Sequence, residues 1–232
     1  MPNKTFSEIN IQDQMAVSLN TAIAVITNPI GFFKTMPKTG GLVEPLIFLA
    51  LIGGVGGILQ AILSIFGVGL AASFFMALAY IVIVPIVTAL FGFVSAAILF
   101  VIWKLMGSLE PFETAFRCGA YAAAITPLTT LLGIIPYLGP LLGLGWMTYL
   151  LVMVSVEVYK IEAKKAWMVF GIIAGLLAIS SISSQIAAQR ITSQLDQLQE
   201  TMKQAEKMTP EEAGQKMGEF LKGLEKGAGK QK

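Results

Sequence analysis

The stretch from Pro45 to Phe66 reads PLIFLALIGGVGGILQAILSIF and contains no charged side chain. The uncharged block that it opens continues to Trp103, and two more blocks without Asp, Glu, Lys or Arg run from Cys118 to Val156 and from Ala166 to Gln189. The hydrocarbon core of a bilayer is about 30 Å thick, so each crossing needs roughly 20 apolar helical residues. The three blocks therefore predict an all-α integral membrane protein with several crossings.

The composition narrows the classes of function. The 232-residue chain has no His, a single Cys and a formal net charge of +2. The absence of His removes the commonest general base and metal ligand, and one Cys cannot form an internal disulfide or a Cys-cluster metal site. We expect no enzymatic activity, no cofactor, no metal and no nucleic-acid partner, and we interpret Cys118 as a small apolar residue at a helix end.

The first 44 residues are interpreted as a cytosolic and interfacial segment. Residues 12–27 place apolar side chains at helical spacing, and Asn28-Pro29 is expected to end that helix. This helix is too short and too polar to cross, so it is expected either to lie in the membrane interface or to pack against the bundle. No cleavable signal peptide is apparent, so insertion is expected to use the transmembrane segments themselves.

The first crossing is predicted at 45–66. It contains Gly53 and Gly57 in a G-x-x-x-G relation, which allows two helix backbones to approach closely, either within the chain or across a dimer face. Residues 67–103 are slightly short for two crossings and a turn. Pro85 divides this region, and we expect a helix at 69–82 that does not cross fully, followed by a crossing at 84–104.

Three further crossings are predicted at 118–135, 139–157 and 166–186, separated by loops at 104–117 and 158–165 or by the Pro- and Gly-containing turn at 136–140. Lys and Arg gather before the first crossing and in these two loops. Short loops rich in Lys and Arg remain in the cytosol. Five crossings satisfy this rule, with a cytosolic N-terminus and an extracytoplasmic C-terminus, and residues 45–186 form the transmembrane domain.

Residues 187–232 are predicted to form an extracytoplasmic helical tail. A seam with steps of three and four residues extends the last crossing. Thr209-Pro210-Glu211-Glu212 resembles a helix start, with Thr as N-cap and Pro in the first turn. The seam consists of Ala188, Ile191, Leu195, Leu198, Met202 and Ala205. The second helix carries an apolar stripe that could bind a partner, formed by Met217, Phe220, Leu221 and Leu224.

The membrane blocks contain few groups capable of chemistry. Their polar side chains are Gln60, Thr88, Ser95, Thr126, Thr129, Thr130 and Ser155. We interpret the hydroxyls as bonded to their own helix backbones or to neighbouring helices. The alternative is a transport path near Gln60, Pro85 and residues 126–130, because broken helices can surround a substrate.

The stretch GSLEPFETAFRCGAY at 107–121, with the Ile-Thr-Pro that ends at Pro127, resembles the membrane domain of the YIP family, the Ypt/Rab-interacting proteins. The segments NPIGFF at 28–33 and VEP at 43–45 are similar to the opening of that domain, and the resemblance covers about residues 25–185. The matching positions, which we assign to packing, are Gly107, Phe112, Phe116, Gly119, Tyr121 and Pro127.

The resemblance implies a five-crossing fold with a cytosolic N-terminus. Eukaryotic members of the family are implicated in vesicle traffic and Rab binding. The short segment before the domain and the helical tail after it favour a prokaryotic plasma-membrane protein. We expect a membrane-organising or scaffold role in the bilayer, with a membrane-protein partner or a second copy of the chain. A small-solute or lipid transporter or channel is the alternative.

Overall fold

The computed structural model describes residues 11–66, 74–205 and 218. The described residues form helices joined by loops and turns, without a strand. The chain divides into two compact units, residues 1–178 and 179–232, and each is described by itself. The described part is therefore all-α, as the sequence predicts.

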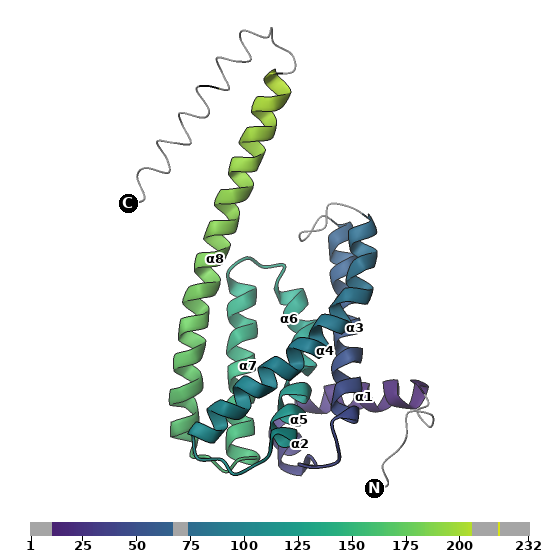
Figure 1. Ribbon diagram of the computed structural model, residues 1–232, viewed down its shortest axis with the longest axis vertical. Helices are drawn as coiled ribbons and strands as arrows, with labels where there is room; N and C mark the ends of the chain where they lie inside the picture. Colours follow the sequence, from purple (N-terminus) through teal and green to yellow (C-terminus); the bar gives the residue numbers. More distant parts are fainter. Residues whose placement is uncertain (1–10, 67–73, 206–217, 219–232) are drawn as a thin grey trace. The chain divides into compact units, whose positions relative to one another are not determined.

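The chain opens with α1 (Ile11–Thr27), close to the predicted bounds. Asn28 ends α1, as expected, but the chain then turns directly into a short helix that was not predicted, α2 (Pro29–Thr35). The Asn28 side chain accepts a 3.0 Å hydrogen bond from the Gly31 amide, and Pro29 occupies the first turn, where no amide hydrogen is needed. Figure 1 shows α1 lying across the direction of α3 and α7.

The first crossing corresponds to α3 (Val43–Ile65). It packs along α4 (Phe74–Leu105), which is one continuous helix with Pro85 inside it. The predicted division into a helix at 69–82 and a crossing at 84–104 is therefore wrong over the described residues. Pro removes one backbone hydrogen bond but is tolerated in membrane helices, where it kinks rather than ends them. Figure 1 shows α4 changing direction along its length.

The middle of the chain forms α5 (Phe112–Ala122), the 3-10 turn η2 (Ala123–Ile125) and α6 (Thr126–Leu132). It continues into α7 (Leu138–Glu157) and α8 (Ala163–Ala205). The loops are shorter than predicted, at 106–111 and 158–162, because α5 and α8 begin earlier. Cys118 accordingly lies inside α5, where it is fully buried, and not at a helix end.

Among the residues that the structure describes, four helices are long and apolar enough to span a membrane. The sequence predicted five. The predicted crossing at 118–135 is absent from the four because η2 divides that segment into shorter helices. The four are Val43–Ile65, Leu78–Leu105, Leu138–Glu157 and Ala163–Glu200.

At one end of the first unit, α3, α5 and α8 begin and α4 and α7 end (Figure 1). We call it the loop end, because it gathers the loops 36–42, 106–111 and 158–162. Much of the core packs near it, including Phe33, Trp103 and Phe116, which are almost completely buried. The predicted helix start at 209–212 and the stripe at Met217, Phe220, Leu221 and Leu224 lie outside the described residues.

Candidate functional site at the loop end

Arg117 is the central charged group of the loop end. Its side chain is only 2% exposed, and each of the three guanidinium nitrogen atoms donates a hydrogen bond. Nε donates to the Pro37 carbonyl at 2.9 Å, Nη1 to the Gly41 carbonyl at 2.9 Å, and Nη2 to Glu44 Oε2 at 3.1 Å. Arg117 thereby fastens the loop 36–42 and the first turn of α3 to α5.

Two further side chains of α5 bind the same loop. Glu113 Oε1 accepts a 2.6 Å hydrogen bond from the Gly41 amide, and Thr114 Oγ1 donates to the Lys38 carbonyl at 3.1 Å. Three side chains from the first two turns of one helix therefore replace the backbone pairing that an irregular loop lacks. This explains how a loop containing two glycines and a proline keeps a defined path.

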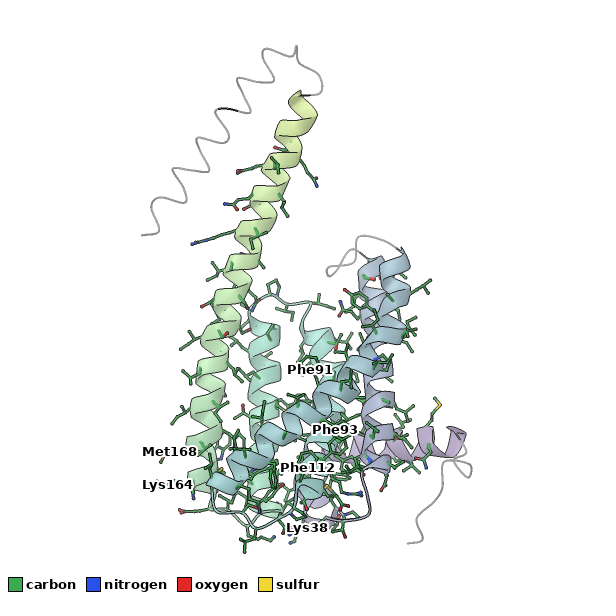
Figure 2. All side chains as sticks on the ribbon, in the orientation of Figure 1. Lys38, Phe91, Phe93, Phe112, Lys164 and Met168 are labelled. Carbon is green, nitrogen blue, oxygen red and sulfur yellow. The ribbon has the colours of Figure 1, made fainter. Side chains whose placement is uncertain are left out.

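Lys38 connects all three loops. Its Nζ forms an ion pair with Glu110 Oε1 at 2.6 Å and donates to the Val158 carbonyl at 2.9 Å. Figure 2 shows Lys38 and Lys164 at this end of the molecule. The ion pair is partly exposed, so its Coulomb energy is screened, but it fixes the loops relative to one another.

A second set of contacts joins the ends of α4 and α7 to α8. Trp103 Nε1 donates to Ser155 Oγ at 2.8 Å, and its ring stacks on Tyr159 with centroids 4.3 Å apart. Lys165 Nζ donates to the Met106 carbonyl at 2.7 Å. Trp103 is almost fully buried, so its indole N–H requires such a partner.

Tyr159, in the loop 158–162, has a hydroxyl group that lacks a hydrogen-bond partner. Its hydroxyl is buried and makes no hydrogen bond of standard geometry, although the Cys118 thiol lies close enough to affect it. Burial raises the pKa of the Tyr159 hydroxyl far above its ordinary value, and Cys118 and Glu110 raise it further. Tyr159 is thus held in its neutral form.

The aromatic residues that resemble the family motif pack onto neighbouring helices. Phe116 stacks on Phe93 of α4 at 4.4 Å between centroids, and Phe112 meets Phe100 of α4 edge-on at 5.9 Å. Figure 2 places Phe93 and Phe112 in the same region. Tyr121 contacts Phe32 of α2 and Phe48 of α3, at 5.4 and 5.2 Å, and the Arg117 guanidinium lies 5.9 Å from its ring centroid. These residues attach α5 to three other helices.

Gly107 lies just beyond the end of α4, with a φ of +100° that L side chains rarely adopt. The hydrogen bond from the Ser108 amide to the Trp103 carbonyl, at 2.9 Å, closes this helix end. Gly119 allows an ordinary contact with Leu99, and Pro127 lies in the first turn of α6. The positive φ at position 107 therefore favours glycine over other residues.

Gly53 and Gly57 both face α4. A Cβ at Gly57 would lie 2.6 Å from the Tyr80 carbonyl oxygen, and one at Gly53 would lie 3.0 Å from Pro85 Cα. The backbones of α3 and α4 thus approach at these two glycines. The G-x-x-x-G spacing is used within the chain in this structure.

Most hydroxyl groups of the membrane blocks bond to the backbone of their own helix. Ser95 donates to the Phe91 carbonyl at 2.7 Å, Thr130 to the Thr126 carbonyl at 2.9 Å, and Ser155 to the Leu151 carbonyl at 2.7 Å. Thr129 also donates to the Thr126 carbonyl. The predicted bonding of these hydroxyls to their own helices is correct.

The sequence did not single out Arg117, Lys38 or the Trp103–Ser155 pair as site residues. Arg117 was predicted to lie in a loop and to mark the cytosolic side, whereas it is buried on a helix. The signal was present: Arg117 lies between Phe116 and Cys118, four residues after Glu113, at helical spacing. Among the described residues no group of three His, Cys, Asp or Glu side chains could hold a metal ion.

Comparison with curated proteins and with solved structures gives no match to this sequence. A family model, the Yip1 domain, matches residues 23–184. The match runs from near the end of α1 into α8 and includes the whole loop end described above. It agrees with the resemblance that the motif at 107–121 carries. The chain is a multi-pass membrane protein that belongs to the Yip1 domain family.

Proposed function

We propose that this protein is a non-enzymatic membrane scaffold whose loop end is a rigid cytosolic platform. The proposal rests on one observation: the charged side chains of Arg117, Lys38 and Glu113 all bind other loops or helix ends of the same chain. Charged groups that are paired within the chain stabilise the surface on which they lie, and they are not free to bind or activate a substrate. The self-bonded hydroxyls of the helices agree with this role.

The same proposal includes five crossings. Successive segments run away from and back to the loop end in the order α3, α4, α5 to α6, α7 and α8 (Figure 1). The segment from Phe112 to Leu132 then serves as the third crossing, interrupted by η2. Lys and Arg at the loop end favour the cytosolic side, with the C-terminus across a prokaryotic plasma membrane.

The α1 helix supports an interfacial position next to this platform. One side of α1 packs on the domain through Ser18, Ala22 and Val25, while Met15, Leu19 and Ile23 on another side are exposed. The exposed three repeat every four residues and form an apolar row on a helix that lies across the bundle (Figure 1). Such a row is suited to the acyl boundary of a bilayer.

The proposed binding face for a membrane-protein partner or a second copy is on α4. Its exposed large side chains repeat in steps of three and four, the spacing of a helix–helix seam. Phe91 is 67% exposed and Leu105 is 82% exposed, so the first unit leaves this row uncovered. The row consists of Phe91, Val94, Ile98, Val101 and Leu105.

The test is the mass of the protein extracted from membranes in mild detergent, measured by native mass spectrometry. We expect a particle heavier than one chain, and we expect Phe91→Ala with Ile98→Ala to reduce it. The matched control is Ile86→Ala with Leu90→Ala, which changes another exposed row of the same helix.

A wild-type protein that is strictly monomeric and free of partners would contradict the scaffold. Liposomes containing the purified protein supply the second half of the test. Flux of ions, small solutes or labelled lipids through them would support the transporter instead, and its path would then be sought near Pro85 and residues 126–130.

A further inference from the structure

Three exposed lysines lie on three different helices of the first unit, all at the loop end. Lys34 is in the last turn of α2, Lys104 is in the last turn of α4, and Lys164 is in the first turn of α8. The two ion pairs in the described part of the chain involve other residues. The ammonium groups of these three lysines can therefore bind an external anion. We call the three residues the lysine rim.

The balance of charge at the loop end also favours an anion. The segment from α2 to the first turn of α8 contains seven Lys and Arg against five Glu. Three of the carboxylates already bind groups of the same chain, namely those of Glu44, Glu110 and Glu113. The two remaining acids, Glu157 and Glu162, do not balance the exposed lysines.

Each lysine of the rim has an accessible apolar side chain one helical turn away, on the same face of its helix. The pairs are Lys34 with Ile30, Lys104 with Phe100, and Lys164 with Met168. Ile30 is 45% exposed and Met168 is 58% exposed. The Lys104 ammonium lies 5.4 Å from the centroid of the half-buried Phe100 ring. Each charge is thus combined with an apolar surface.

The three pairs share one orientation. The helix α2 leads into the loop 36–42 and α4 ends at the loop end, whereas α8 begins there (Figure 1). In every pair, nevertheless, the lysine is nearer the loop end and the apolar residue is further from it, as Figure 2 shows for Lys164 and Met168. Since the helices run in both directions, a common level across the molecule accounts for this order. Lysines above an apolar surface are typical of the level of lipid headgroups.

We propose that the lysine rim binds the phosphate groups of anionic phospholipids in the leaflet that borders the loop end. The apolar neighbour favours a lipid over a soluble anion, because the glycerol and the first acyl carbons can cover it. One lysine near a membrane surface increases the binding of an anionic lipid by about fivefold. This inference rests on the membrane location of the chain and does not depend on the scaffold or on the number of crossings.

The test is native mass spectrometry of the full-length protein, purified and delipidated in detergent and then mixed with equal amounts of phosphatidylglycerol and phosphatidylcholine. We expect the first three bound lipids to be phosphatidylglycerol by about fivefold. The triple variant Lys34→Gln, Lys104→Gln and Lys164→Gln is expected to bind both lipids equally, and the same three changes to Arg are expected to keep the preference. Equal binding of both lipids by the wild-type protein would overturn the proposal.

The single variants Lys164→Gln and Lys160→Gln form a matched pair. Both side chains are exposed and both changes remove one positive charge, but Lys160 lies in the loop 158–162 and not on a helix. We expect Lys164→Gln to reduce the number of preferred lipids from three to two, and Lys160→Gln to leave three. Equal effects would show a general attraction by net charge and would overturn the rim.

Added inorganic phosphate separates a lipid from a soluble anion as the occupant. At constant ionic strength, we expect phosphate to leave the preference for phosphatidylglycerol unchanged, because it cannot use the apolar neighbour of each lysine. Loss of the preference in phosphate would assign the lysines to a soluble anion and would contradict the proposal.

Discussion

A single buried arginine defines the loop end at the level of residues. Arg117 uses three of its nitrogen atoms to hold two carbonyl groups and one carboxylate from a segment more than 70 positions earlier. Its planar fork can reach three acceptors that point in different directions, which an ammonium group cannot do. The stability of the loop 36–42 therefore depends on the shape of this side chain as well as on its charge.

The Arg117→Lys variant is expected to lose at least about 2 kcal/mol of unfolding free energy, because at least one buried acceptor remains unpaired. Glu44→Gln is the matched comparison. Its carboxylate is 56% exposed, so solvent screening limits the loss to less than about 1 kcal/mol. Thermal unfolding in detergent measures both, and equal losses would show that the charge pair dominates.

Tyr159 gives a prediction about pH. Its pKa is raised in the folded protein, so the neutral form contributes stability that is fully present below the ordinary tyrosine value of about 10 and is lost as pH rises above it. Tyr159→Phe keeps the stacking on Trp103 and removes an unbonded hydroxyl. We expect the variant to be at least as stable at pH 7 and to lose less stability between pH 10 and 11. A larger loss in the variant would contradict this.

At the level of elements, the pairing of α3 with α4 depends on two glycines and a tolerated proline. Gly53 and Gly57 remove the Cβ atoms that would separate the helices, and Pro85 lies opposite Gly53. In lipid, helices associate through such close packing and not through the hydrophobic effect. α4 continues through Pro85 at the point where it approaches Gly53.

Alanine substitutions at two glycines of α3 test the close packing of α3 on α4. Gly57→Ala places a methyl group against the Tyr80 backbone and is expected to destabilise the protein by about 1–3 kcal/mol. Gly54→Ala, on the same helix, meets only the Pro85 ring at 3.9 Å and is expected to change stability by less than about 0.5 kcal/mol. Unfolding in detergent is the measurement, and similar effects of the two variants would argue against close packing at Gly57.

For the whole molecule, the decisive property is the side of the membrane on which each loop lies. The proposed five crossings place the loops 36–42, 106–111 and 158–162 together on the cytosolic side. The turn between α6 and α7 and the outer part of α8 then lie on the opposite side. One assay of accessible cysteines can examine all of these positions.

We expect cysteines at Thr39, Leu109 and Ala163 to react only from the cytosolic side, in a Cys118→Ala background. Those at Leu138 and Ser193 are expected to react only from outside. All five side chains are exposed in the structure, whereas Ser108 is buried and a Cβ at Gly139 would meet the Leu132 backbone. Reaction of Leu109→Cys from outside would refute the five-crossing arrangement.

The sequence was sufficient for the fold class because long uncharged blocks have few physical solutions. It also located α1, α3 and α7 closely and identified the motif at 107–121. The sequence-based prediction failed at two residues whose type is compatible with two environments. Proline ends helices in water but is tolerated inside membrane helices, as at Pro85. Arginine is common in loops but can also be buried with polar partners, as at Arg117. The partners of Arg117 and Lys38 lie far away in the chain, and no local pattern reveals such pairs.

The position of Lys38 has a consequence for biosynthesis. Its two partners, Glu110 and the Val158 carbonyl, are 72 and 120 positions further along the chain. Ribosomes add about 5–20 residues per second, so Val158 is synthesised roughly 6–24 s after Lys38. During that time the nascent protein has synthesised several helices without a complete loop end.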